Sequence, residues 1–283
     1  MSPLSHKEYI WTLKLIRHQK TMLSKKDLSL LELYRFCDNE EQRQLLEELI
    51  LRFNFLDSDK YPCFLNDVVK CICGFGYKEE ESALVAFCHD YSADSSQVVL
   101  NDLKVPMAMA GYCHIKTINR FERILKEYNN SKGRIKHFIA VDEFVGSGHT
   151  LALRLKEFKD HGFPDATIDF VFLAGMSDAV LMAKEQGASV YAVHEMKKGI
   201  SGFYQGDELQ HKRDIMLSLE GKLAPVINDT LLTDHSFGYH GSEALFCRQD
   251  KNVPNNVFPV FWWKEDDGGR KRNTIFVRVQ DGY

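Results

Sequence analysis

Two kinds of apolar pattern alternate through the middle of the chain. Short, mainly apolar runs, of the length of buried parallel strands, lie at residues 83–87, 138–141, 167–174 and 189–194. Apolar residues recur at helical spacing over 97–103, 117–128 and 177–186, and from Leu151 through Leu155 to Phe158. Strands that alternate with helices predict an α/β fold, with a parallel sheet flanked by helices.

The two ends of the chain have patterns of their own. Residues 5–54 carry apolar residues at helical spacing, which predicts a mainly helical N-terminal lobe over residues 1–80. From about residue 220 turns and aromatic residues become frequent, which predicts a small cap on a main domain that begins at residue 81. Strands are predicted in this cap at 244–246 and 257–263, with an edge strand at 274–279.

The aromatic residues of the cap allow two interpretations. Such side chains can stack on a purine or pyrimidine base, and they can equally form the core of a small subdomain. The residues concerned are Phe237, Tyr239, Phe246, Phe258, Phe261, Trp262 and Trp263.

The composition of the 283-residue chain narrows the class of protein. A net charge of −4 argues against a broad nucleic-acid-binding surface. The chain has no run of 18 apolar residues, and its first residues lack the basic start and apolar core of a signal peptide. Seven cysteines at scattered positions suit reduced thiols. We therefore expect a cytoplasmic protein that does not associate with membranes.

The stretch 138–150, which reads FIAVDEFVGSGHT, combines an apolar strand, two carboxylates and a loop of small residues before a helix. Glycines let the backbone turn sharply, and the start of a helix presents N–H groups that suit a phosphate. Ser147 and Thr150 add hydroxyl donors. The carboxylates of Asp142 and Glu143 would repel a phosphate; they suit ribose hydroxyl groups or a magnesium ion. A sugar phosphate with free hydroxyl groups satisfies both halves of the stretch.

This stretch resembles the phosphoribosyl diphosphate (PRPP) signature of type I phosphoribosyltransferases. The resemblance implies that Asp142 and Glu143 hold the ribose hydroxyl groups and act as the catalytic pair. It also implies that a loop cradles the 5′-phosphate, with Mg²⁺ neutralising the pyrophosphate leaving group. The second acid is Glu where many members have Asp, and His149 stands where a small residue is common. The implied phosphate-binding residues are Val145, Gly146, Ser147, Gly148, His149 and Thr150.

A second polar loop, residues 89–96, follows the first predicted strand. In the enzymes that the chain resembles, a loop at this place binds pyrophosphate, which would assign that role to Ser95 and Ser96. The usual glycines and basic residue are missing here, so a plain helix-capping loop is an equal alternative. No equivalent of the mobile flap of these enzymes is found between Asp102 and Asn119. His194 and Glu195, at the end of the fourth predicted strand, are further candidates on the same rim.

The C-terminal segment 237–265 is similar to the end of a phosphoribosyltransferase-like family of bacterial conflict systems. The similarity rests on Gly238-Tyr239, on Pro254-Asn255-Asn256 and on Phe261-Trp262-Trp263. Together with the signature stretch, it implies a type I phosphoribosyltransferase-like fold and a role in anti-phage defence. It also implies protein partners encoded in the same defence operon.

Three functions can be weighed against these residues. The first is a phosphoribosyltransferase that binds PRPP or a nucleotide. The second is a non-catalytic nucleotide sensor or interaction subunit of an anti-phage complex, which the missing basic loop and flap favour. The third, a methyltransferase, would need a glycine-rich loop after the first strand, and HDYSADSS does not supply one. The sequence identifies neither the acceptor base, the oligomeric state nor the partner proteins.

Overall fold

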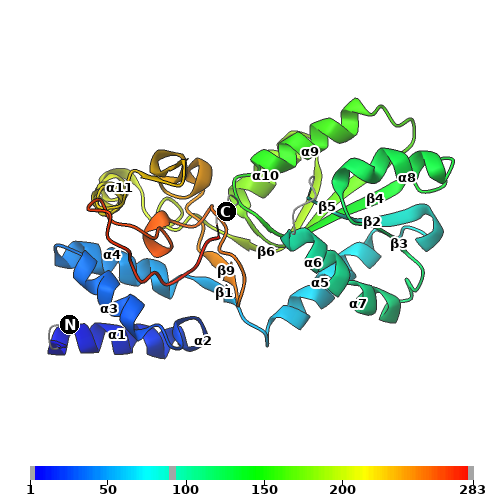
Figure 1. Cartoon of the computed structure of the whole chain (residues 1–283). Helices are drawn as coiled ribbons and strands as arrows, with labels where there is room; N and C mark the ends of the chain where they lie inside the picture. The colour runs from blue at the N-terminus through cyan, green and yellow to red at the C-terminus, as the bar shows by residue number, and fades with distance from the viewer. Residues whose placement is uncertain (1–3, 89–93, 280–283) are drawn as a thin grey trace. The chain divides into compact units, whose positions relative to one another are not determined.

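The computed structural model describes residues 4–88 and 94–279, and the chain divides into two compact units (Figure 1). Unit 1 consists of Met1–Ser58 together with Lys197–Tyr283, and unit 2 is Asp59–Met196. The boundaries of these units, at residues 58 and 196, differ from the expected boundary at residue 80 and from the expected start of a cap at about residue 220. The N-terminal helices and the whole C-terminal region belong to unit 1, and residues 59–80 belong to unit 2.

Unit 2 is built on a five-stranded sheet in the order β3-β2-β4-β5-β6, with every neighbouring pair parallel. The central strands are almost continuously apolar and buried, as expected of strands covered on both faces. Ala86 pairs with Val141 at the end of β2, and β4 continues beyond that point. The strands are β2 (Ser82–Ala86), β3 (Lys116–Ile118), β4 (His137–Val145), β5 (Thr167–Met176) and β6 (Ser189–Met196).

Helices cover both faces of this sheet, with α8 and α9 on one side and α5 and α7 on the other (Figure 1). This is the type I phosphoribosyltransferase-like arrangement that the sequence predicted. The helices of unit 2 are α5 (Tyr61–Gly74), α6 (Ser95–Asp102), α7 (Lys104–Met109), α8 (Ile124–Asn130), α9 (His149–Asp160) and α10 (Ser177–Glu185). Two 3₁₀ turns, η1 (Glu79–Glu81) and η2 (Phe121–Arg123), complete the unit.

One predicted helix of unit 2 is wrong in its first half. Residues 117–128 were expected to be helical throughout, but 116–118 form the edge strand β3. Ile118 pairs with Val85 of β2 and is 2 % exposed, so sheet pairing and burial decide the structure of this segment. The helix α5, which lies where the sequence pattern was ambiguous, packs against β5 and β6.

Unit 1 combines helices with short strands and irregular segments. The strands β1 and β9 pair in parallel, and β7 and β8 form a small antiparallel hairpin. The helices are α1 (His6–His18), α2 (Lys20–Leu23), α3 (Asp27–Phe36), α4 (Glu40–Leu51) and α11 (Gly206–Glu220). The strands are β1 (Asn54–Leu56), β7 (Val226–Ile227), β8 (Thr230–Leu231) and β9 (Phe246–Arg248), and the 3₁₀ turns are η3 (Leu232–His235), η4 (Tyr239–Gly241) and η5 (Pro259–Phe261).

The predicted strands at 257–263 and 274–279 are wrong. Pro259 lacks a backbone N–H and starts the 3₁₀ turn η5, after a single bridge between Val257 and Ala244. Both indole groups donate to backbone carbonyls: Trp262 to Val257 and Trp263 to Ala224, each at 2.9 Å. These rings are at most 2 % exposed, so they belong to the core, as the second interpretation of the aromatic residues predicted.

Two buried carboxylates hold the irregular part of unit 1 in place. Glu243 is fully buried and accepts hydrogen bonds from the N–H groups of Ile200 (2.8 Å) and Ser201 (2.7 Å) and from the guanidinium of Arg213 (3.0 Å). Glu220 accepts from the Ser236 hydroxyl at 2.6 Å and from the N–H of Phe237 at 3.0 Å. Left-handed backbone concentrates in the intervening segment, at Phe237, Gly238, His240, Gly241 and Glu243.

Candidate functional site

Asp142 of β4 lies at the carboxyl end of the sheet. It directly follows Val141, which pairs with Ala86, the last residue of β2. Its partner on the other side is Phe172 of β5. The strand β4 includes the two acidic residues and ends at Val145, four residues later than the predicted strand. The sequence therefore placed Asp142 on the correct rim of the sheet, where ligands of open α/β sheets bind.

The Asp142 carboxylate is held by two donors and faces other acids. The Ser95 hydroxyl donates to its Oδ1 at 2.7 Å, and the backbone N–H of Glu143 donates to the same oxygen at 2.6 Å. The pKa of Asp142 is raised to about 8, chiefly by burial and also by the nearby charge of Asp94, whereas the two hydrogen bonds act in the opposite direction. A carboxyl group of this kind exchanges a proton near neutral pH unless a ligand or cation stabilises its charge.

Glu143 occupies a different environment from its neighbour. Successive side chains of a strand point to opposite faces, and the burial of β4 alternates accordingly from Asp142 to Val145. Glu143 is 4 % exposed, whereas Asp142 is half-buried. The structure thus brings Asp142 to the open rim and encloses Glu143. For the predicted acidic pair, this geometry supports direct ligand contact by Asp142 more strongly than by Glu143.

The loop that follows β4 leads directly into α9. Gly146, Ser147 and Gly148 are half-buried, and His149 and Thr150, the first residues of the helix, are exposed. The hydroxyl oxygen of Ser147 accepts from the N–H of His149 at 3.4 Å. The first N–H groups of a helix have no partner within the helix, so this loop offers donors and a positive dipole end to an anion.

Two glycines determine the shape of this loop. Gly148 has φ 78°, and a Cβ atom there would meet the Cβ of Ala179 on α10 at 3.4 Å. In β5, a Cβ atom on Gly175 would lie 2.5 Å from Cγ1 of Val145 and 3.0 Å from Cβ of Ala192. Gly175 therefore makes room for the first residue of the loop, a role that the sequence analysis missed. Its place opposite Val145 in the sheet register is the signal that identifies it.

The second candidate loop is described only from Asp94 onward, and its residues 89–93 lie outside the described part of the chain. Asp94 caps α6 by accepting from the N–H of Ser96 at 2.8 Å. The Ser96 hydroxyl is fully buried and accepts from the N–H of Cys88 at 3.0 Å. The Ser95 hydroxyl donates to Asp142. These contacts favour the alternative of a helix-capping loop over direct binding of pyrophosphate by the two serines.

One cation near this rim was not predicted. Arg154 of α9 is largely buried, and its Nε donates to the carbonyl of Phe87 at the end of β2, at 3.4 Å. It also pairs with Glu157 at 3.2 Å. Arg154 follows Thr150 by four residues and so shares a helix face with it, which is the sequence signal for its position.

Arg120 and Arg123, which follow β3, pair with their neighbours. Arg120 contacts Glu122 at 2.7 Å, and Arg123 donates to the amide oxygen of Asn119 at 3.3 Å. His194 lies within β6 opposite Ala174, with its ring 5.5 Å from that of Phe64, and Glu195 pairs with Gly175.

Among residues 4–88 and 94–279, no three His, Cys, Asp or Glu side chains are grouped so as to hold a metal ion. In the same described residues, no helix is both long enough and apolar enough to span a membrane. Carboxylates of one or two residues still suit Mg²⁺, because this ion takes most of its ligands from water and from substrate oxygens.

The parallel sheet, the acidic residues at the end of β4 and the phosphate-type loop before α9 define a type I phosphoribosyltransferase-like protein. Residues 28–278 match the PRTase-CE family, and the chain belongs to that family. No curated protein matches the chain.

Two solved structures resemble parts of the chain. One is a Helicobacter pylori xanthine-guanine-hypoxanthine phosphoribosyltransferase, 14% identical, with a TM-score of 0.31; the match covers 51% of this chain and 86% of that one. The other is a hypothetical protein from Neisseria gonorrhoeae with bound ppGpp, 9% identical, with a TM-score of 0.36; it covers 59% and 97% of the two chains. Neither likeness bears on the ligand of this chain.

Proposed function

We propose that unit 2 binds a 5′-phosphorylated ribose compound, either PRPP or a nucleotide. The observation that carries this proposal is the position of Asp142 on the rim, three residues before the loop that opens α9. The loop Val145–Thr150 would take the 5′-phosphate on backbone N–H groups. The half-buried carboxylate of Asp142 would accept hydrogen bonds from ribose hydroxyl groups, and the enclosed Glu143 would support that end of the strand.

Mg²⁺ is proposed to assist this binding. Asp142 is the residue that would hold the ion, in company with oxygens of the ligand and water. When bound, the ion would neutralise charge on a pyrophosphate group. A positive ion beside Asp142 favours its charged form, so we expect binding to release a proton near neutral pH.

Phosphoribosyl transfer is the reaction that such a site would support. The bond between C1 of ribose and pyrophosphate breaks, a bond from C1 to the acceptor forms, and the carboxylates stabilise the positive charge that develops on the ribose. Asp94 does not favour this reaction, because its charge repels pyrophosphate and its carboxylate caps α6. We therefore keep the alternative of a non-catalytic nucleotide-binding subunit. A role in defence with operon-encoded partners is proposed on the sequence resemblance alone.

Calorimetry tests the binding proposal with PRPP and a panel of nucleoside monophosphates, each with and without Mg²⁺. Thr150→Asp is the informative variant, because an acid in the first turn suits the α9 dipole and repels a phosphate. We expect it to fold normally and to lose binding. Asn130→Asp, which adds the same charge at an exposed site on α8, is the control. No heat from any ligand with the unmodified protein would refute the proposal.

A pyrophosphate-release assay separates the two alternatives. The isolated chain is incubated with PRPP and each common base, with and without candidate partner proteins. Turnover at ordinary enzyme rates, roughly 1–1,000 per second, would establish the transferase and exclude the purely sensing subunit. Binding without release, in the absence and presence of partners, is the result expected of a sensor.

Asp142→Asn with Glu143→Gln should abolish the biological function in a phage-challenge assay while leaving the protein folded.

A further inference from the structure

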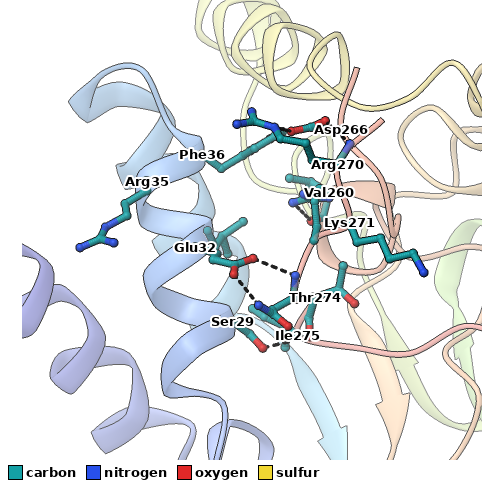
Figure 2. Close-up of a pocket in the computed structure, with 13 residues that line it drawn as sticks. Ser29, Glu32, Arg35, Phe36, Val260, Asp266, Arg270, Lys271, Thr274 and Ile275 are labelled. Atoms are coloured by element: carbon teal, nitrogen blue, oxygen red, sulfur yellow. Dashed lines mark hydrogen bonds and ion pairs between the residues drawn. The ribbon is translucent and has the colours of Figure 1, made fainter. Parts of the chain in front are cut away.

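Unit 1 contains a cavity of about 360 Å³ between α3 and residues 260–275. Figure 2 shows Glu32 and Phe36 of α3 facing the segment that carries Thr274 and Ile275, whereas Arg35 points away. Small-molecule sites span roughly 300–1,000 Å³, so this cavity suits a molecule about as large as a sugar phosphate.

Arg272 brings a positive charge to the cavity without a carboxylate beside it. Its guanidinium donates to the carbonyl oxygens of Trp263 (2.8 Å) and Val260 (3.1 Å), and its Cζ lies 4.3 Å from the centre of the Phe36 ring. Within residues 4–88 and 94–279, no carboxylate lies at ion-pair distance from it. Burial lowers its pKa to about 10. A guanidinium has five N–H groups, so donors remain for an oxyanion.

The two carboxylates that line the cavity already have donors of their own. Glu32 accepts from the backbone N–H of Asn273 at 2.8 Å and from its side-chain amide. Asp266 accepts from the backbone N–H of Arg270 at 2.8 Å and from its Nε at 2.9 Å. Their charge offsets that of Arg272 only at longer range, and neither satisfies its remaining N–H groups.

The other cations of the cavity lining differ in how they are paired. Arg35 donates to Glu8 at 2.6 Å and is turned away from the cavity, and Arg270 is neutralised by Asp266. Lys271 is exposed at the rim and has no ion-pair partner among the described residues, and its side chain extends away from α3 in Figure 2. Arg272 is therefore the unneutralised cation beside Phe36 in this cavity, and Lys271 adds an unneutralised positive charge at its edge.

We propose that this cavity binds a small phosphate monoester, with Arg272 donating to the phosphate oxygens and Lys271 adding a second positive charge. A phosphate monoester carries about −1.5 to −2 charges at neutral pH, which matches the two cations. The Phe36 ring and two carbonyls fix the guanidinium, so binding orders few groups. The ligand would connect α3 with the C-terminal segment. This site lies in unit 1 and does not rest on the function proposed for unit 2.

Intrinsic tryptophan fluorescence provides a readout confined to unit 1, because Trp11, Trp262 and Trp263 all belong to it. The full chain is titrated with inorganic phosphate, ribose 5-phosphate and, as the neutral control, ribose. We expect a saturable change with the two phosphates that weakens with added salt, and none with ribose. An equal response to both phosphates would assign recognition to the phosphate group alone; a tighter response to ribose 5-phosphate would assign part of it to the sugar.

Variants of the exposed Lys271 test the site without disturbing the core. Lys271→Ala should weaken binding about two- to fivefold, and Lys271→Glu should weaken it further, because charge is first lost and then reversed. Lys7→Glu, on the exposed face of α1, should leave it unchanged. Arg272→Lys should weaken binding about tenfold or more, because an ammonium group cannot donate paired hydrogen bonds from a planar group as a guanidinium does.

The same titration separates this site from unit 2. Asp142→Asn with Glu143→Gln, or Thr150→Asp, should leave the fluorescence response intact. The proposal is overturned if the unmodified protein gives no saturable response. It is also overturned if Lys271→Glu responds like the unmodified protein, or if the response disappears with the unit 2 variants alone.

Discussion

The two units of this protein stabilise their backbone in different ways. In unit 2 most backbone groups form hydrogen bonds within parallel strands and helices, whose apolar residues recur with regular spacing. In the C-terminal part of unit 1, side chains of buried residues hold loops that have little regular structure. Single substitutions at polar or glycine positions should therefore damage unit 1 more than unit 2.

Two carboxylates illustrate the difference. Glu243 of unit 1 is fully enclosed and receives donors from two backbone N–H groups, a hydroxyl and a guanidinium. Asp142 of unit 2 is half-buried, receives two neutral donors and lies near Asp94. The charge of Glu243 is satisfied within the fold, whereas that of Asp142 is not, which is the property expected of a ligand-binding group.

The largest expected effect belongs to Gly238→Ala in unit 1. The residue has φ 78°, and a Cβ atom would overlap the carbonyl group of Asn256. We expect a loss of about 4 kcal/mol or more in the free energy of unfolding, measured by urea denaturation. Gly241→Ala is the matched control, since its φ is also positive and the space around it is open. It should cost only about 1 kcal/mol. Equal losses would show that backbone conformation alone matters here.

Glu243→Gln should cost about 3 kcal/mol, because the amide keeps the size of the carboxylate and loses the charge that faces Arg213. Urea denaturation followed by tryptophan fluorescence measures the loss in unit 1. Glu265→Gln, at a half-buried position of the same unit, should change the free energy of unfolding by less than about 0.5 kcal/mol. A Glu243→Gln variant as stable as this control would contradict the anchoring role.

Gly175→Ala should cost unit 2 about 1–3 kcal/mol, because the added methyl group lies 2.5 Å from the Val145 side chain. The displaced loop should also bind nucleotide more weakly. Thermal denaturation and calorimetry measure the two effects. Gly74→Ala, at the end of α5, is the control, since nothing lies within 4 Å of its Cβ position. If both variants behave alike, the contact with Val145 does not constrain the loop.

The smallest expected effect is a gain in stability. The pKa of Asp142 is raised from 3.8 to about 8 on folding, so the carboxyl group makes the protein less stable as pH rises from about 4 to 8. Asp142→Asn should match the unmodified protein near pH 4 and exceed it at pH 8, on the order of 1 kcal/mol because the site is half-buried. Melting temperatures across this pH range, with Asp160→Asn as an exposed control, measure the difference. A variant less stable than the unmodified protein at pH 8 would refute the raised pKa.

The same contrast explains what the sequence could predict. β2, β4, β5 and β6 were found because each contains a mainly apolar run next to a segment of helical spacing, and the motif at 138–150 gave the strand, the acidic residues and the loop in the observed order. The edge strand β3 was missed because its three residues gain their conformation from pairing with β2. Residues 257–263 were predicted as a strand because they form an apolar run. The structure buries them instead in a turn that begins at Pro259, where both indole groups donate to backbone carbonyls, and an apolar run does not distinguish the two cases.

The site shows the same limits at the level of single residues. The pattern placed Asp142 near the end of a strand and the glycine loop before a helix, because strand, acid and glycine are local signals. It did not separate the open position of Asp142 from the enclosed position of Glu143, which follows from the extension of β4. Gly175 and Arg154 were missed because they act on the loop and the rim from other parts of the chain.

The pairing of β1 with β9 has a consequence for how the protein is made. The N–H of Asn54 donates to the carbonyl of Leu245, 191 residues later in the chain, and all of unit 2 is synthesised between these partners. On the ribosome, unit 2 can fold as soon as residue 196 has emerged. The N-terminal helices must wait, with apolar side chains such as Leu45 and Leu49 uncovered, until the last part of the chain arrives. We therefore expect nascent unit 1, rather than unit 2, to be the part of this protein that chaperones bind.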